Sequence, residues 1–205
     1  MARPPSNIRQ RIIRSARTRF LRDGVDGASM RSIASGARTS LGMITYYFGS
    51  KDELFMAVVE DVYEKLLADL EGILQRRAPV RERLRGALIR LGGASEVELD
   101  VIRMMVREAL VSSRRLNTLL DRFMRGHLPL LLATIAEGQR DGVIAGEVPA
   151  PLAMVATFVM GALPQFARRA AGDRLPLGAL PEGDAFVDVL LDMAFRGIGP
   201  RPPTS

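Results

Sequence analysis

The stretch SMRSIASGARTSLGMITYYFGSKDELF, residues 29–55, carries the signals that decide the fold. Ser29 can cap a short helix through its hydroxyl, and Gly36 supplies the turn that ends this helix. A second short helix is expected to begin near Thr39 or Ser40 and to end near Phe48. The sequence therefore predicts two short helices joined by a tight turn.

Longer helices flank this pair. Apolar residues recur four apart before it, which predicts a supporting helix over 7–23 with an apolar stripe and an arginine-rich back, ended by Gly24. The stripe consists of Ile8, Ile12, Ala16 and Phe20. After the pair, Ser50 and Glu53 match a capping box, in which the serine hydroxyl and the glutamate carboxylate satisfy each other's backbone N–H groups. This box opens a long helix that is expected to reach about residue 77.

The rest of the chain has helical periodicity and no recognisable strand pair. Pro79 and the Gly92–Gly93 pair bracket a fifth helix. The remaining expected helices cover residues 97–112, 116–140, 151–171 and 184–196. Pro129 is expected to kink or divide the helix over 116–140. Gly- and Pro-rich loops separate the last three helices, and the tail 197–205 is expected to be disordered. The sequence thus predicts an all-α protein of about nine helices.

The 205-residue chain has a formal net charge of +6, and this charge is unevenly placed. Residues 1–51 hold ten Lys or Arg and two acids, a net charge of +8, whereas the other 19 basic and 21 acidic residues leave −2. This distribution is typical of a polyanion-binding module joined to a near-neutral body. A solvated basic face gives the same charge, so the arrangement of the helices has to decide.

Composition excludes several classes of protein. The chain has no cysteine and one histidine, which excludes disulfides, Cys–His nucleophiles and a zinc site built from His and Cys. No catalytic residue, metal or cofactor is therefore predicted. No signal peptide is recognisable, and charges or prolines interrupt the apolar runs before they reach the roughly 18–20 residues that span a bilayer. We expect a cytoplasmic protein without a membrane partner.

Two short helices behind a longer supporting helix make a helix-turn-helix, which holds its second short helix outside the core so that the exposed face enters the DNA major groove. Ile44 and Phe48, four residues apart, are expected to pack inward. Thr45 and one or both of the tyrosines at 46 and 47 then face outward, with hydroxyls suited to phosphate oxygens or base edges. Tyr47 is the tyrosine expected to pack against the core.

This part of the chain resembles the N-terminal domain of TetR-type transcriptional regulators over about residues 8–56, in register and without a gap. The matching residues are Ile33, Ala34, Ala37, Ser40, Gly42, Ile44, Phe48, Ser50, Lys51 and Leu54. The sequence departs from the family pattern at Arg38, where the turn usually has glycine, and at Thr45 to Tyr47, which replace the commoner Tyr-x-His. The remaining chain resembles the family only in its layout of helices.

The resemblance implies a DNA-binding domain over residues 1–51 and an effector-binding and dimerisation domain over 52–205. It implies DNA contacts from the helix-turn-helix and from the start of the next helix. These contact residues are Ser29, Arg31, Arg38, Thr39, Ser40, Leu41, Gly42, Thr45, Tyr46, Tyr47 and Lys51. The serines at the helix starts are equally explained as caps alone.

The resemblance also implies a homodimer formed by the last two long helices and a pocket for a small, largely apolar effector. The last helix is apolar on more than one side, and the expected interface residues are Leu152, Val155, Val159, Met160, Leu163, Phe186, Val189, Leu190 and Met193. A central position of both helices in a monomer explains the same pattern. The pocket candidates on the middle helices are Arg103, Met104, Met105, Arg107, Glu108, Leu120, Phe123, Met124 and His127. Ordinary core packing explains the same methionines.

Three functions are open at this point. The leading one is a homodimeric repressor that leaves a palindromic operator when its effector binds. The same protein would be an activator if its operator lay at another position relative to the promoter. The second is a ligand-binding or interaction module with degenerate DNA binding, which Arg38 and Thr45 leave open. The third is an all-helical enzyme.

Overall fold

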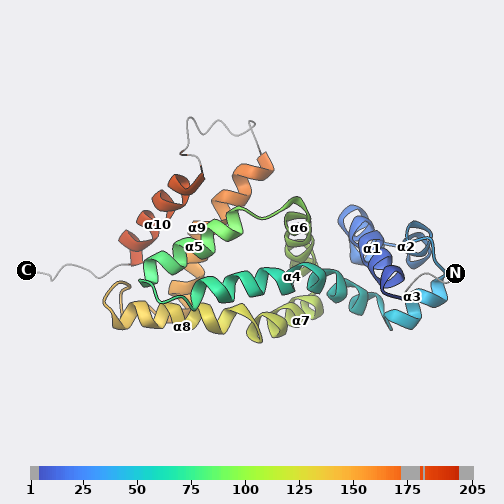
Figure 1. Cartoon of the computed structure of the whole chain (residues 1–205), viewed down its shortest axis with the longest axis horizontal. Helices are drawn as coiled ribbons and strands as arrows, with labels where there is room; N and C mark the ends of the chain where they lie inside the picture. Colours follow the sequence, from blue (N-terminus) through green and yellow to red (C-terminus); the bar gives the residue numbers. More distant parts are fainter. Residues whose placement is uncertain (1–4, 172–180, 182, 199–205) are drawn as a thin grey trace, which may run out of the picture. The chain divides into compact units, whose positions relative to one another are not determined.

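A computed structural model of the chain describes residues 5–171, 181 and 183–198. These residues form ten helices (Figure 1). They are α1 (Pro5–Gly27), α2 (Met30–Gly36), α3 (Leu41–Tyr47), α4 (Lys51–Leu74), α5 (Val80–Gly92), α6 (Glu96–Val111), α7 (Ser113–Met124), α8 (His127–Arg140), α9 (Ala150–Ala171) and α10 (Gly183–Ile198). The predicted all-α class, with the helix-turn-helix at the N-terminal end, is confirmed.

The described residues contain one helix more than the sequence predicts. The segment 116–140, expected as a single helix, lies in two helices, because α7 ends at Met124 and α8 begins at His127. Gly126 between them has non-helical backbone angles and is the point of division. Pro129 was expected to kink or divide the helix, but it lies in the first turn of α8, where a missing N–H removes no helical hydrogen bond.

Two other sequence expectations concern the ends of helices. Gly24 interrupts the helical backbone of α1 with a φ of 76° and a ψ of 167°, a conformation open to glycine but rarely to other residues, and a short further segment runs to Gly27. The tail expected to be disordered begins at 197, but α10 extends to Ile198, and the tail residues 199–205 lie outside the described residues. Most of the loop expected between α9 and α10 also lies outside them.

The chain divides into two compact units, and the first comprises Met1–Leu66 with Ser95–Phe123. In this unit α1 packs against α2 and α6, and α2 packs against α3. Its largest fully buried side chains include Ile12, Phe20, Ile33, Ile44 and Phe55. Each such side chain contributes about 1.5–3 kcal/mol through burial, so the two short helices are held by the core that they share with α1.

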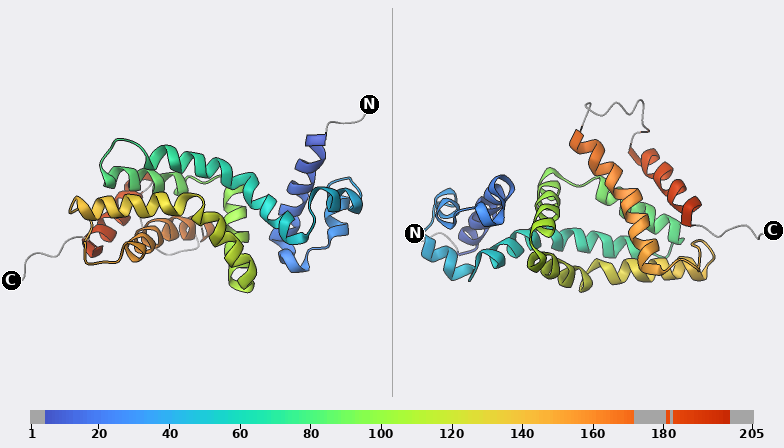
Figure 2. Two further views of the ribbon diagram at one scale, coloured as in Figure 1. Left: turned by 90° about the horizontal axis from the view of Figure 1, so that it is seen from below. Right: turned by 180° about the vertical axis from the view of Figure 1, so that it is seen from behind.

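The second unit comprises Leu67–Ala94 with Met124–Ser205. Here α9 packs against α5, α8 and α10, and the orange α9 and red α10 run side by side in the views of Figure 2. Two buried clusters hold these helices together. One contains Val80, Leu84, Ile135, Ile144 and Ala153, and the other contains Leu88, Ala162, Val187 and Leu191. A β-carbon on Gly161 would collide with the side chain of Leu88, so glycine is what lets α9 approach α5 this closely.

Ion pairs join the same helices at the surface. Arg85 on α5 donates from Nε to Asp188 on α10 at 2.5 Å, and this hydrogen bond holds the pKa of the Asp188 carboxyl below its usual value. Arg83 on α5 is buried, donates to the carbonyl of Leu74 at 2.9 Å and pairs with Glu137 on α8. The ion pairs of Arg85 and Arg83 thus hold α5 against α10 and α8.

One described helix, over Ala150–Arg169 in α9, is long and apolar enough to cross a membrane. The sequence predicts none, because charges and prolines interrupt its apolar runs. In the structure this helix packs against three others of its unit. Core helices of folded domains meet the same criteria of length and hydropathy.

Candidate DNA-binding site

The helix-turn-helix consists of α2, the turn over 37–40 and α3. The hydroxyl of Ser29 caps α2 by accepting the N–H of Ser32 at 3.5 Å, and the hydroxyl of Ser40 caps α3 by accepting the N–H of Met43 at 3.2 Å. Both helices therefore begin at the cap residues that the sequence predicts. Such short helices are marginal alone, so the caps and the shared core together define them.

α1 supports the turn at close range. The hydroxyl of Ser15 on α1 donates to the carbonyl of Ile33 at 2.8 Å, and a β-carbon on Gly36 would collide with that hydroxyl. Arg38, two residues after Gly36 in the turn, has a φ of 51°. For a residue with a side chain this left-handed conformation costs roughly 1–2 kcal/mol, a cost from which glycine is exempt. The turn thus keeps an arginine at a position that glycine would occupy with less strain.

α3 has one buried and one exposed face. Ile44 is 0% and Phe48 is 4% exposed, whereas Tyr46 is 79% exposed. Tyr47 is half-buried, and its ring lies edge-on to that of Tyr46 with 5.2 Å between the ring centroids. The other exposed residues of α3 are Leu41, Gly42 and Thr45. The inward and outward faces are those that the spacing predicts, and most of the outward face is not used by the core.

The remaining predicted DNA contacts lie around α3. Ser29, Arg31, Arg38 and Ser40 are exposed, and Thr39 and Lys51 are half-buried. The Nζ of Lys51 donates to the carbonyl of Asp26 at 2.9 Å, which leaves two of its N–H groups for another acceptor. Ser50 accepts the N–H of Glu53 at 3.1 Å as predicted, but the Glu53 carboxylate accepts from the N–H of Gly49 instead of completing the box at Ser50.

Arg115, near the start of α7, joins three elements that border the helix-turn-helix. Its side chain is buried, and it donates from Nε to Asp52 on α4 at 2.9 Å and from Nη1 to Glu108 on α6 at 2.8 Å. It also donates to Asp26, at the end of α1, at 3.1 Å. This hydrogen bond holds the pKa of the Asp26 carboxyl below its usual value. Glu108 in turn accepts the N–H of Val25 at 3.1 Å. We call Arg115, Asp26, Asp52 and Glu108 the Arg115 cluster.

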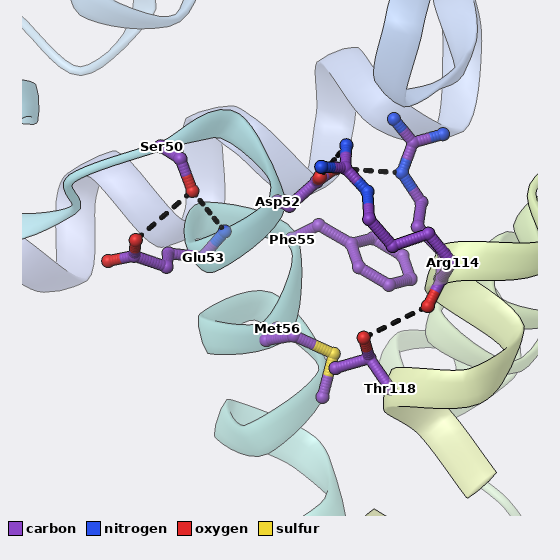
Figure 3. Close-up of a pocket in the computed structure, with 8 residues that line it drawn as sticks. Ser50, Asp52, Glu53, Phe55, Met56, Arg114 and Thr118 are labelled. Carbon is purple, nitrogen blue, oxygen red and sulfur yellow. Dashed lines mark hydrogen bonds and ion pairs between the residues drawn. The ribbon is translucent and has the colours of Figure 1, made fainter. Parts of the chain in front are cut away.

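A cavity of about 370 Å³ lies beside this cluster, between the first turns of α4 and of α7 (Figure 3). The side chains of Phe55, Met56 and Thr118 face it, and the ion pair of Asp52 and Arg114 lies at one end. The hydroxyl of Thr118 donates to the carbonyl of Arg114 at 3.0 Å. An apolar wall with one charged end suits a small organic molecule. None of these residues is among the effector-pocket residues predicted from the sequence.

The predicted effector-pocket residues are divided between the two units, with Met124 and His127 in the second. Met104 and Glu108 are buried, and Arg107 donates to the carbonyls of Phe20 and Leu21, the latter at 3.0 Å. Of the others, Arg103, Leu120 and Met124 are exposed, and Met105, Phe123 and His127 are half-buried. Arg107 and Glu108 also line a small hollow together with residues 23–27. The effector pocket itself stays a prediction.

Most of the predicted dimer-interface residues lie on the surface of the second unit. The exposed ones, each 45–59% exposed, are Leu152, Val155, Val159, Leu163, Val189 and Met193. Met160 is half-buried, and Phe186 and Leu190 are buried within their own unit. An apolar groove of about 360 Å³ between α9 and α10 continues this surface. Within the described part of the chain, no group of three or more His, Asp or Glu residues is placed to hold a metal ion.

The Arg115 cluster and the cavity beside it were missed by the sequence analysis. The members of the cluster come from four helices, and Asp26 lies 89 residues from Arg115 along the chain. No local spacing connects them, so the sequence carries no periodic signal for the cluster. The capping box of α6, formed by Ser95 and Glu98, was also missed, although its Ser-x-x-Glu spacing is readable in the sequence.

Two capped short helices, a supporting helix and an exposed polar and aromatic face define a helix-turn-helix DNA-binding protein. Residues 12–58 match the family model of bacterial regulatory proteins of the tetR family. The HTH-type transcriptional repressor SCO4008 of Streptomyces coelicolor is 30% identical over 152 residues, which cover 73% of this chain and 74% of that protein. The chain therefore belongs to the TetR family and is a DNA-binding transcriptional repressor, not an enzyme.

Solved structures share the fold along nearly the whole chain. A TetR-like transcriptional regulator from Rhodococcus sp. RHA1 is 24% identical, with a TM-score of 0.69 over 96% of this chain and 98% of that one. The transcriptional regulator FadR from Bacillus subtilis, in complex with stearoyl-CoA, is 19% identical, with a TM-score of 0.71 over 92% and 98% of the two chains. The similarity of fold thus extends beyond the N-terminal residues that carry most of the sequence similarity.

Proposed function

We propose that this repressor acts as a homodimer that binds a palindromic operator and leaves it when a small, largely apolar effector binds. In the bound state the α3 helices of the two protomers enter successive major grooves, roughly 34 Å apart along the duplex. An effector that prefers a conformation with another separation lowers the affinity for DNA, because operator and effector compete for the conformations of one protein.

The observation that carries the proposal is the exposed face of α3. Tyr46, at 79% exposed, projects from a helix whose opposite face is fully buried. A large aromatic side chain in that position contributes little to the core, whereas it offers a ring and a hydroxyl to base edges and phosphates. Thr45 is exposed beside it, and its hydroxyl donates to the carbonyl of Leu41 at 3.3 Å while keeping its lone pairs for a donor on DNA.

Positive charge around α3 supports the same role. Arg31 lies in the first turn of α2, Arg38 lies between the two short helices and Lys51 lies after them, where phosphates flank a groove that holds α3. We assign DNA contacts to these three and to the other residues predicted from the sequence. We also propose that residues 1–51 bind DNA, that residues 52–205 bind the effector and form the dimer, and that the protein acts in the cytoplasm, where the DNA is.

The dimer is supported by the exposed apolar stripe of α9. Leu152, Val155, Val159 and Leu163 recur on one face of the helix, and each is at least 50% exposed. A contiguous apolar stripe of this kind is costly in water and is typical of an interface. A two-fold axis that pairs α9 and α10 with their copies buries the stripe and leaves the α3 helices of the dimer equivalent.

The effector is supported by the chemistry of the candidate sites. The Bacillus subtilis FadR was crystallised in complex with stearoyl-CoA, a molecule with a long apolar part. In this chain the cavity between α4 and α7 has an apolar wall of Phe55 and Met56. Met105, a predicted pocket residue on α6, is half-buried and of a type that adapts to varied ligands. We propose an apolar effector bound at one of these places.

Selection of binding sites from a random duplex pool tests the proposal. The purified protein is expected to recover a palindrome, and Tyr46→Ala and Lys51→Ala are expected to weaken binding to it. Lys65→Ala is the matched control, because Lys65 is exposed on the same helix as Lys51 but away from the helix-turn-helix. Recovery of no sequence preference would mean that the helix-turn-helix is degenerate and would refute the proposal.

Sedimentation measurements test the dimer separately. Val159→Glu, at 50% exposed on α9, is expected to give a monomer, because it puts a charge into the apolar interface. Val106→Glu is the matched control, because Val106 is 56% exposed on α6, outside the proposed interface. A Val159→Glu protein that sediments as the wild type does would exclude this face of α9.

A further inference from the structure

A basic hollow lies between α1 and the turn that joins α2 to α3. It encloses about 640 Å³ and is lined by Arg11, Arg14, Ser15 and Thr18 of α1 and by Arg38 with the two residues before it. None of these lining residues is acidic, and apart from Ala37 none is apolar. The hollow therefore offers guanidinium and hydroxyl groups, and no aromatic ring lines it.

The three arginines of this hollow lack acidic partners within the described part of the chain. Nη2 of Arg11 donates to the carbonyl of Arg38 at 3.3 Å, and the buried Nε of Arg11 has no hydrogen-bond partner there. Arg14 and Arg38 make no ion pair with the described residues. Arg17, Arg19 and Arg31 also make no ion pair with the described residues, but they do not line the hollow. Six other arginines of the same unit do pair with carboxylates: Arg22, Arg103, Arg107, Arg114, Arg115 and Arg122. Three neighbouring cations without an anion repel one another, and an anion between them removes that cost.

The backbone of Arg38 supplies an independent reason. Its φ of 51° is one that glycine adopts with less strain. A strained residue that persists without a local structural advantage is typical of a functional position. The guanidinium group of Arg38 makes no hydrogen bond or ion pair with the described residues and lines the hollow, so it is available to an anion there.

We propose that this hollow binds a phosphate group of the DNA backbone beside the groove that α3 enters. The inference rests on the proposed function and deepens it. Arg38 precedes the cap of α3 by two residues, and the N-terminal end of a recognition helix is the part that approaches the bases. Planar guanidinium groups bind phosphate oxygens with two parallel hydrogen bonds, which fixes the register of the duplex.

Salt-dependent affinity for the selected operator tests the proposal. Arg14→Gln and Arg38→Gly are each expected to make the slope of log affinity against log salt shallower by about 1. At ~0.15 M salt each is expected to lose about fivefold in affinity, the contribution of one released counterion. Arg17→Gln is the matched control, because it removes the same charge from α1 but does not line the hollow. The Arg38→Gly protein is expected to have a Tm no lower than that of the wild type, so a loss of DNA affinity in this variant would not be due to unfolding.

Operators with single methylphosphonates, each neutralising one phosphate, identify the bound group. Neutralisation of the phosphate at one backbone position of each half-site is expected to lower the affinity of the wild type. The affinity of Arg14→Gln is expected to fall little further when that same phosphate is neutralised. Additive losses would overturn the proposal, as would equal effects of Arg14→Gln and Arg17→Gln. A third outcome would also overturn the proposal. If inorganic phosphate binds the wild type but not Arg14→Gln, and every operator with a neutralised phosphate binds as tightly as the parent operator, the hollow is a site for a free anion instead.

Failure of this inference is distinguishable from failure of the proposed function. If the palindrome is recovered and Tyr46→Ala weakens binding while the hollow variants do not, only the phosphate site is refuted. If no palindrome is recovered, the sequence-specific function fails first, and the salt slope of non-specific binding still reports whether the hollow contacts DNA.

Discussion

Replacement of Arg115 by methionine is expected to destabilise the first unit strongly. Arg115 is 5% exposed and donates to three carboxylates, of which Glu108 is 2% exposed. Methionine keeps much of the apolar stem and its volume but removes the charge and all the donors. The Glu108 carboxylate then stays buried with the N–H of Val25 and a longer contact to Arg107 at 3.5 Å.

The magnitude follows from the burial of each partner. Removal of one member of a buried ion pair costs about 3–5 kcal/mol, because the other charge is left without compensation. The remaining contacts of Glu108 reduce this cost. Asp26 and Asp52 have side chains that are 78% and 28% exposed, so the loss of their contacts adds about 0–1 kcal/mol each. We expect a total of about 2–4 kcal/mol, which lowers the Tm by roughly 4–16 °C for a chain of this size.

Urea and thermal unfolding followed by far-ultraviolet circular dichroism measures this cost. Glu108→Gln is the informative partner variant, because it keeps an oxygen that can accept the Val25 N–H while removing the buried charge. The loss of unfolding free energy in the double variant, Arg115→Met with Glu108→Gln, is expected to be about 1–3 kcal/mol smaller than the sum of the losses in the two single variants. A loss below about 1 kcal/mol for Arg115→Met, or strict additivity of the two changes, would refute the argument.

Three further predictions concern packing and pH. Gly161→Ala is expected to cost about 1–3 kcal/mol in unfolding experiments, because the added methyl group overpacks α9 against Leu88. Ile44→Ala, at a fully buried position, is expected to cost about 2–5 kcal/mol. The pKa of Asp188 is lowered by Arg85, so the stabilisation from this pair is complete above the unfolded pKa near 3.9 and is lost as the pH falls through the lower folded value. The difference in unfolding free energy between the wild type and Asp188→Asn is therefore expected to be constant from about pH 5 to 8 and to shrink below about pH 4.

The helix-turn-helix could be predicted from the sequence because its determinants are local. Ser29 and Ser40 cap the helices that they immediately precede, and the four-residue spacing of Ile44 and Phe48 places both in the core. The division between α7 and α8 could not be assigned correctly, since Pro129 is the stronger breaker in a helix interior. Its position in the first turn of α8 depends on where the helix begins, which Gly126 decides.

The groups that hold the first unit together could not be predicted, because their partners are distant in sequence. Charge pairs such as Arg115 with Asp52, 63 residues apart, carry no periodic signal. The same limitation affects the predicted effector residues. Met104 has the residue type of a pocket lining, but it lies in the core at 1% exposed, and type alone does not distinguish a core methionine from one that binds a ligand.

The unequal charge of the chain illustrates what the structure adds. The first 51 residues carry +8 by count, and a count gives every arginine the same weight. In the structure Arg22 is neutralised by the adjacent Asp23 at 2.7 Å, whereas Arg14 and Arg38 have no carboxylate partner among the described residues. A cation that is already paired must break its ion pair before it can bind a phosphate, so the unpaired arginines contribute more to the attraction for DNA. The pairing of the arginines therefore separates those that are already neutralised from those that can bind a phosphate, and Arg14 and Arg38 of the hollow between α1 and the turn belong to the second group.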